Sequence, residues 1–181
     1  MIPQPPGENN SPAPSWRLVP FSEEHGPLVC GWRYPAPYNV YDWPDWTELV
    51  RRGDEFADEE LRRHQYVAAV DADGVLVGFG QLFPLVSESG TPIVRLGLGL
   101  RPDLCGGGRG VELTRLLVLE ARRRSPGCTV DLEVLTWNIR ATRAYEKAGF
   151  RISDTYVRDT PTGPAEFHCM VSPLHNFGGI R

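Results

Sequence analysis

Residues 100–113 read Leu-Arg-Pro-Asp-Leu-Cys-Gly-Gly-Gly-Arg-Gly-Val-Glu-Leu, with four glycines among the five residues 106–110. An apolar run at 93–100, typical of a strand, precedes the glycines, and apolar residues at helical spacing come after them. The sequence therefore predicts a strand, a glycine loop and a helix. Such a loop leaves the first N–H groups of the helix without intrahelical acceptors, and glycine lets a ligand approach them closely. The loop is thus a candidate anion site, most naturally for a phosphate.

The residues after the glycines argue against two common kinds of phosphate site. A nucleoside triphosphate loop would end in Gly-Lys-Ser/Thr, whereas Val111 and Glu112 come directly after Gly110. A dinucleotide-binding loop would carry glycine or alanine at position 111. An unrelated nucleotide-phosphate binder is therefore a remote hypothesis.

A second block, at residues 138–150, reads Asn-Ile-Arg-Ala-Thr-Arg-Ala-Tyr-Glu-Lys-Ala-Gly-Phe and comes after an alternating, strand-like run at 130–134. Asn138 is a favourable N-cap, and Gly149 and Phe150 suit the end of a helix. At about 3.6 residues per turn, Asn138 and Tyr145 lie on one face with Ala141 or Thr142 between them. A small alanine there leaves room for a ligand chain. The alternative is a capped amphipathic helix with a surface tyrosine.

Together, these blocks resemble the GNAT superfamily of acyl-CoA-dependent N-acyltransferases over roughly residues 16–173. The loop resembles that family's pyrophosphate loop, Gln/Arg-x-x-Gly-x-Gly/Ala, through Gly108 and Gly110, although Cys105 departs from the first position. Since backbone donors hold most of the phosphate, we interpret Cys105 as a weakened side-chain contact. The second block matches the family pattern Asn-x-x-Ala-x-x-x-Tyr-x-x-x-Gly-Phe at every position.

The resemblance implies an α/β fold with a mixed, mostly antiparallel sheet of six to seven strands and helices on both faces. It also implies transfer of an acetyl group from acetyl-CoA to a primary amine, by direct attack in a ternary complex, without a metal. The residues implied in binding acetyl-CoA are Leu98, Gly99, Leu100, Cys105, Gly106, Gly107, Gly108, Arg109, Gly110, Asn138 and Ala141. The alternative is an inactive acyl-CoA-binding sensor, which only Cys105 supports.

Acyl transfer to an amine requires removal of a proton from the amine and protonation of the leaving thiolate. Tyr145 stands at the family position of the general acid. Glu133 stands where one branch of the family carries its base, and the alternative is a solvated carboxylate on the strand. Arg95 lies near the position at which other branches carry an acidic base, so that route is closed.

Residues 31–46 are dense in aromatic residues and interrupted by three prolines, which exclude a long regular element. By resemblance, this segment folds over the sheet beside the thioester. We expect Trp32, Tyr34, Tyr38 and Tyr41 to line the acceptor pocket. The alternative is that these rings fill the core.

The composition limits the partners, the metal or disulfide sites and the location to be expected. A net charge of -4 and a pI near 5.6 argue against nucleic acid as a partner and suit a cationic amine. The four cysteines and four histidines share no metal-ligand or disulfide spacing. No apolar run is long enough to span a membrane, which leads us to expect a cytoplasmic protein without a membrane partner. The acceptor, a small molecule or a protein N-terminus, stays open, as does a homodimer.

The predicted organisation is a proline-rich disordered tail at 1–15, one domain at 16–174 and a short tail at 175–181. Before the glycine loop we expect a strand at 16–20, a short helix from about 22, and helical structure at 45–64 interrupted near Gly53. A hairpin at 65–71 and 75–83 comes next, with its turn at 71–74. The last two strands are expected at 150–157 and 166–171.

Overall fold

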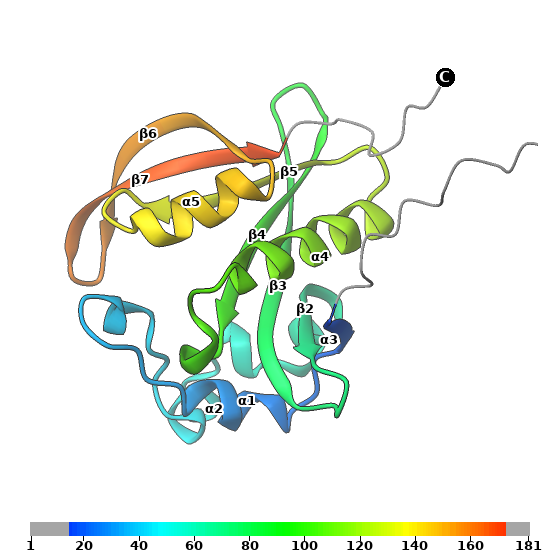
Figure 1. Ribbon diagram of the computed structural model, residues 1–181, viewed down its shortest axis with the longest axis vertical. Helices are drawn as coiled ribbons and strands as arrows, with labels where there is room; N and C mark the ends of the chain where they lie inside the picture. Colours follow the sequence, from blue (N-terminus) through cyan, green and yellow to red (C-terminus); the bar gives the residue numbers. More distant parts are fainter. Residues whose placement is uncertain (1–14, 173–181) are drawn as a thin grey trace, which may run out of the picture.

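The computed structural model describes residues 15–172, which form one sheet with helices on both faces (Figure 1). The strands are β1 (Arg17–Pro20), β2 (Tyr66–Val70), β3 (Leu76–Val86), β4 (Pro92–Leu100), β5 (Thr129–Leu135), β6 (Arg151–Thr160) and β7 (Gly163–Ser172). The helices are α1 (His25–Cys30), α2 (Trp46–Arg52), α3 (Glu59–Gln65), α4 (Arg109–Arg124) and α5 (Ile139–Lys147). Three short 3-10 turns are η1 (Tyr38–Tyr41), η2 (Glu55–Ala57) and η3 (Pro102–Leu104).

The strand order is β1-β2-β3-β4-β5-β7-β6. Every neighbouring pair is antiparallel except β4 and β5, which are parallel and joined through α4. The predicted mixed, mostly antiparallel sheet is therefore confirmed. The expected helical region at 45–64 is divided into α2 and α3, and α2 ends at Gly53, whose φ of 66° closes the helix in the left-handed conformation. The predicted tails lie outside the described residues, apart from Ser15.

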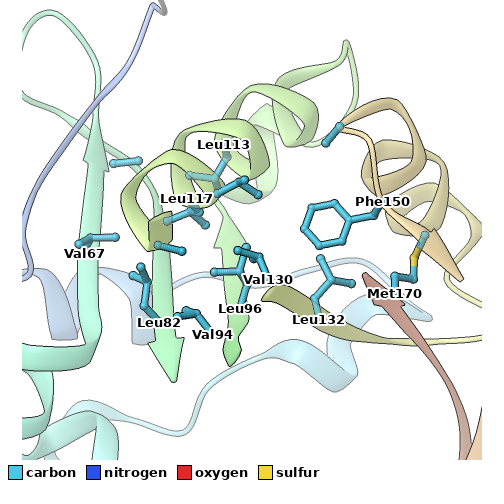
Figure 2. Close-up of a cluster of buried hydrophobic side chains, with 14 of the residues drawn as sticks. Val67, Leu82, Val94, Leu96, Leu113, Leu117, Val130, Leu132, Phe150 and Met170 are labelled. Atoms are coloured by element: carbon cyan, nitrogen blue, oxygen red, sulfur yellow. The ribbon is translucent and has the colours of Figure 1, made fainter. Parts of the chain in front are cut away.

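Helix α4 packs closely on one face of the sheet. Its apolar side chains Leu113 and Leu117 point toward strand residues such as Leu96 and Val130 (Figure 2). Gly80 of β3 lies beneath Leu117, and an added Cβ would overlap that side chain. The glycine is needed because the helix backbone could not otherwise come this near to the strand. This contact holds the middle of α4 against the sheet.

The opposite face carries a second, aromatic core under α1, α2 and η2. Its centre is Phe56, which is fully buried and contacts Phe21, Tyr66 and Phe79 with ring centroids 5.3–5.9 Å apart. Trp43 stacks on Phe56 at 4.4 Å. Edge and offset contacts of this kind stabilise aromatic clusters beyond the burial of their area. The core thereby anchors both ends of the segment that carries η1, which lies beside the candidate site.

Candidate active site

The site begins where β4 and β5 separate. The two strands pair only from Ile93 with Thr129 to Leu96 with Leu132, whereas β4 stays paired with β3 as far as Leu100. The Arg101 N–H donates to the Val77 carbonyl, so the backbone groups of Arg101 point toward β3. Along β4, the backbone groups of successive residues point alternately toward β3 and away from it. Leu98 and Leu100 therefore direct their backbone groups away from β3, into the gap left by β5.

The Tyr34 hydroxyl donates a hydrogen bond of 2.7 Å to the Leu100 carbonyl, at the edge of this gap. Leu98 lies beyond the last β4–β5 pair, so no strand partner satisfies its backbone N–H and carbonyl on this side. Unpaired backbone groups at a cavity wall are suited to bind a ligand that carries amides.

The glycine loop presents a row of unpaired N–H groups at the start of α4. Gly106, Gly107 and Gly108 have φ values of 109°, 56° and 82°, in the region that glycine tolerates and other residues rarely adopt. Within residues 15–172, no hydrogen bond is made by their amides or by the Gly110 amide. A Cβ on any of the three would meet no atom within 4 Å, so the space before them is open. The loop thus presents free donors to open space, and its binding of an anion stays a prediction.

The strand gap and the glycine loop border one cavity of about 420 Å³. Most of the residues predicted for the site line it. They are Leu98, Leu100, Cys105, Gly106, Gly107, Gly108, Gly110, Glu133, Asn138, Ala141 and Tyr145, together with Tyr34 and Tyr41. Tyr34 and Tyr145, which are 111 positions apart in sequence, thus meet at one site.

Helix α5 forms one wall of the cavity, and Asn138 fixes its first turn. The Asn138 side chain accepts a hydrogen bond of 3.1 Å from the Ala141 N–H, as predicted for an N-cap. Its amide nitrogen donates to the Tyr41 hydroxyl at 3.0 Å. Asn138 therefore connects α5 to η1 across the cavity. This contact explains why an N-cap is almost fully buried, with 6% of its surface exposed.

Tyr145 lies two turns after Asn138 on the same wall. Burial raises the pKa of its phenol above the ordinary value, and the nearby Tyr41 phenol raises it further. Within residues 15–172, its hydroxyl has no hydrogen-bond partner, while its ring packs near Phe150 with centroids 6.3 Å apart. Tyr145 is thus a protonated donor at the cavity wall with its hydrogen bond available.

Glu133 borders the cavity, but both of its carboxylate oxygens are engaged. Oε1 accepts from Arg95 at 2.7 Å and from the Tyr156 hydroxyl, and Oε2 accepts from Arg158 at 2.6 Å. Arg95 also donates two hydrogen bonds to the buried Asp131, at 2.7 and 3.0 Å. Burial, and then the bond to Glu133, raise the pKa of Tyr156 to about 12. Glu133 is therefore the centre of an ion-pair network and not a solvated carboxylate.

Two residues expected to bind acetyl-CoA lie outside the lining of this cavity. Gly99 directs its backbone groups to β3, and an added Cβ would overlap the ring of Phe79 on the opposite face. The Arg109 guanidinium lies over the Trp16 ring, 5.4 Å from its centroid, and pairs with Glu112 at 3.3 Å. Neither position was distinguishable from its neighbours by the glycine pattern alone.

Two aromatic residues expected in the acceptor pocket also have other surroundings. Trp32 packs against the second core, with its ring centroid 6.1 Å from that of Phe79. Tyr38 lies under Arg140, whose guanidinium is 3.9 Å from the ring centroid. Neither residue lines this cavity or the smaller one that adjoins it. Tyr34 and Tyr41 alone represent the aromatic segment at the first cavity.

Three cations on α5 were not anticipated from the sequence. Arg140, Arg143 and Lys147 line the cavity, and no ion pair joins any of them to a carboxylate within residues 15–172. Their spacing of three and seven residues places them on one face of the helix, the face that carries Ala144. This face is turned away from the one that carries Asn138 and Tyr145, so the sequence pattern that marked those two residues gave no signal for the three cations.

A second cavity, of about 310 Å³, lies on the other side of the end of β4. Its lining consists of Val40, Tyr41, Asp42, Trp43, Phe79, Gln81, Gly97, Leu98 and Gly99. Tyr41, Gly97 and Leu98 line both cavities, so the two adjoin at this part of the strand. No sequence pattern indicated this cavity, because it combines β3, β4 and the aromatic segment.

Residues 15–172 contain no helix long and apolar enough to cross a membrane. Within the same range, no group of three or more His, Cys, Asp or Glu side chains is arranged to hold a metal ion.

Residues 31–150 match the model of the acetyltransferase (GNAT) family. The chain therefore belongs to the GNAT acetyltransferase family, which confirms the resemblance seen in the two sequence blocks. The structure is similar to a spermidine N-acetyltransferase chimera from Vibrio cholerae and hSSAT, with a TM-score of 0.70 at 15% identity over 87% of this chain and 94% of that one.

It is also similar to an aminoglycoside N(6')acetyltransferase from Legionella pneumophila, with a TM-score of 0.68 at 19% identity over 90% of this chain and 94% of that one. A third similar structure is AAC(6')-Ib in complex with paromomycin and acetyl-CoA, with a TM-score of 0.65 at 22% identity over 88% and 94% of the two chains. At these identities the likeness establishes the fold, and the acceptor must be inferred from this chain's own residues.

Proposed function

We propose that this protein is an N-acetyltransferase that transfers the acetyl group of acetyl-CoA to a primary amine by direct attack within a ternary complex. The observation that carries the proposal is the first cavity, which brings together unpaired loop amides, the unpaired edge of β4 and the Tyr145 phenol. In the net reaction, the amine nitrogen bonds to the acetyl carbon and the carbon–sulfur bond breaks. The amine loses a proton, and the thiolate gains one.

The residues present fit the phosphates of acetyl-CoA. The amides of Gly106, Gly107, Gly108 and Gly110 supply donors at the positive end of a 16-residue helix. Arg140, Arg143 and Lys147 supply positive charge on the facing helix. Cys105, in place of Arg or Gln, removes one side-chain donor from this set, which supports a phosphate site held mainly by the backbone and by α5.

The unpaired edge of β4 fits the rest of that ligand. Acetyl-CoA supplies the acetyl group as a thioester at the end of a chain that contains two amides. The Leu98 backbone can donate to and accept from such a chain, and a donor beside the thioester would stabilise negative charge on the acetyl oxygen during attack. Ala141 on the facing helix leaves this gap unobstructed.

Tyr145 is proposed to be the general acid. Its raised pKa keeps the phenol protonated at neutral pH, so it can donate to the departing thiolate, whose acid has a pKa of about 8.5. The absence of a competing acceptor within residues 15–172 leaves the proton available.

Glu133 fits a positioning role better than the role of base that the resemblance implied. To accept a proton it would have to weaken its bonds to Arg95 and Arg158 and leave two cations without their shared partner. As a carboxylate it instead ties β4, β5 and β6 together along one wall of the cavity. A water molecule is then the acceptor of the amine proton.

Acetyl-CoA is expected to stabilise the fold, because the phosphate donors converge only in the native loop. At 100 times its Kd the gain in unfolding free energy should be about 2.7 kcal/mol, seen as a rise in melting temperature. Release of CoA thiol with a panel of amines then measures turnover. A melting temperature that millimolar acetyl-CoA leaves unchanged contradicts the proposal, while a rise without turnover of any amine or N-terminal peptide supports the inactive sensor.

The α5 cations yield a second expected result. Replacing Arg143 and Lys147 together by Gln should weaken CoA binding roughly tenfold, the effect of about 1.4 kcal/mol. The loop amides are assigned to the pyrophosphate, and we expect these two cations, which line the same cavity, to contact the 3'-phosphate, so binding of 3'-dephospho-CoA should change much less. Calorimetric titration of CoA and of 3'-dephospho-CoA measures the two changes in affinity. A second salt concentration shows whether the lost contacts are charge contacts, because screening weakens exposed ones.

Arg52→Gln, at an exposed position on α2, is the matched control and should leave both affinities unchanged. If the double variant weakens CoA and 3'-dephospho-CoA equally, the cations contact the pyrophosphate instead. If it weakens neither, α5 takes no part in phosphate binding.

A further inference from the structure

The second cavity differs from the first in the chemistry of its walls. Tyr41, Trp43 and Phe79 supply rings, and Val40 and Leu98 supply aliphatic surface. Its polar side chains are the Gln81 amide and the Asp42 carboxylate. A cavity near 300 Å³ is at the small end of the range for ligand sites, about 300–1,000 Å³. The cavity suits a compact, mainly apolar molecule.

Asp42 is a half-buried carboxylate without a cation. Its Oδ1 accepts a hydrogen bond of 2.9 Å from the Tyr34 N–H, which fixes its orientation. Within residues 15–172, no Lys, Arg or His forms an ion pair with it. Glu133, the acid of the first cavity, is in contrast held by two arginines. Asp42 is therefore the carboxylate at this site with capacity to bind a cation.

The reacting centre can be reached from the second cavity beside Gly97. Gly97 and Leu98 line both cavities, and an added Cβ at Gly97 would meet only Gln81 atoms, at 3.5 Å. Because residue 97 lacks a side chain, the wall between the cavities is thin at this point. An amine held in the second cavity can thus approach the backbone of Leu98, where the thioester is proposed to lie.

We propose that the acceptor is a primary amine with a single positive charge on a compact apolar or aromatic body, and that Asp42 binds its ammonium group. The ammonium gives one proton to water before its nitrogen attacks the acetyl carbon, and the second proton, lost as the amide forms, balances the one that the thiolate gains. This inference rests on the proposed acetyltransferase function and names its substrate class. The rings of Tyr41 and Trp43 enclose the body of the acceptor and attract its cation.

Polycationic acceptors fit this site poorly. Spermidine or an aminoglycoside carries several ammonium groups, and each would require its own acceptor when it leaves water. The second cavity offers one carboxylate, Asp42, so the further ammonium groups of such an acceptor would have no anionic partner in its lining. The acceptor class therefore differs from the acceptors named for the similar structures.

The test compares 2-phenylethylamine with spermidine and kanamycin by steady-state kinetics. We expect kcat/KM for 2-phenylethylamine to exceed the other two at least tenfold. Asp42→Asn should reduce kcat/KM for 2-phenylethylamine at least tenfold, mainly through KM, and leave KM for acetyl-CoA unchanged. The Asn carbonyl can still accept from the Tyr34 N–H, so the segment keeps its geometry and the change is one of charge.

Asp45→Asn is the matched control, three residues away and outside both cavities. Asp45 caps α2 through the Thr47 N–H, and Asn is an equally good cap, so the fold is retained. Equal kinetics for the two variants, or a preference for spermidine or kanamycin, would overturn the inference.

Calorimetric binding of 2-phenylethylamine, with and without saturating CoA, tests the site independently of turnover. Wild type should bind the amine and Asp42→Asn should bind it at least tenfold more weakly, whereas 2-phenylethanol, which has no charge, should show no such difference. If acetyl-CoA raises the melting temperature but Asp42→Asn leaves amine binding unchanged, this inference fails and the acetyltransferase proposal stands. If acetyl-CoA has no effect on melting, it is the proposed function that fails.

Discussion

Tyr145→Phe is expected to lower kcat by about 100-fold or more, the usual range for loss of a general acid. The change removes only the hydroxyl group, because the Phe ring can keep its packing near Phe150. Acetyl-CoA affinity and melting temperature should therefore stay close to wild type. Single-turnover and steady-state rates of thiol release, with calorimetric titration of CoA, separate the chemical step from binding.

Burial also fixes the sign of the pH dependence at Tyr145. Because its pKa is raised, the phenol stays protonated to a higher pH than an ordinary tyrosine, whose pKa is about 10. Between pH 7 and 9, the wild-type rate should therefore not fall through loss of the Tyr145 proton. The rate profile of Tyr145→Phe should have the same shape in this range. Tyr38→Phe is the matched control, since its ring lies under Arg140 outside both cavities. A Tyr145→Phe variant that keeps more than half of wild-type kcat would show that the thiolate takes its proton elsewhere.

Gly110→Val is expected to abolish the rise in melting temperature produced by acetyl-CoA, a loss of at least 100-fold in affinity. The backbone at Gly110 does not have a positive φ, so a side chain is tolerated there without strain. An added Cβ would face the Ala144 Cβ at 3.6 Å, and the branched methyl groups of valine would extend into the lining between the loop amides and α5. The protein should fold while the phosphate loses its approach to the backbone.

Gly110→Ala is the control, because one methyl group fits at van der Waals distance from Ala144 and the family pattern admits alanine at this position. It should keep most of the acetyl-CoA effect. Gly108→Val should also lose binding, but at a cost in stability, since its φ of 82° is strained for valine. Unchanged CoA affinity in folded Gly110→Val would mean that the loop has a structural role and the phosphates bind elsewhere.

Features encoded by neighbouring residues could be predicted from the sequence. The glycine loop, the Asn138 cap and the hairpin at 71–74 each depend on a few adjacent positions, and each is found as expected. The order of strands and helices was predicted from periodicity. The mixed sheet was predicted from resemblance, since pairing of β4 with β5 in parallel joins residues 36 positions apart.

Features decided by side chains that meet across the sheet could not be predicted. Glu133 faces Arg95 and Arg158, which are 38 and 25 positions away, and no local pattern indicates that both would pair with it. The aromatic segment was recognised as a unit, but its rings divide among the second core, a cation contact and the cavity walls. Which ring goes where depends on how η1 turns against α5.

The early end of the β4–β5 ladder leaves the sheet incomplete in the protein alone. Four residue pairs join β1–β4 to β5–β7, and past Leu96 the two parts diverge with unmatched backbone groups between them. An extended ligand chain with its own amides would act there as a short additional strand, hydrogen-bonded to β4 on one side and packed against α5 on the other. The acyl donor would then be a structural member of the sheet for as long as it is bound. When the product CoA dissociates after transfer, the edge of β4 would again be unpaired and could bind the next molecule of acetyl-CoA.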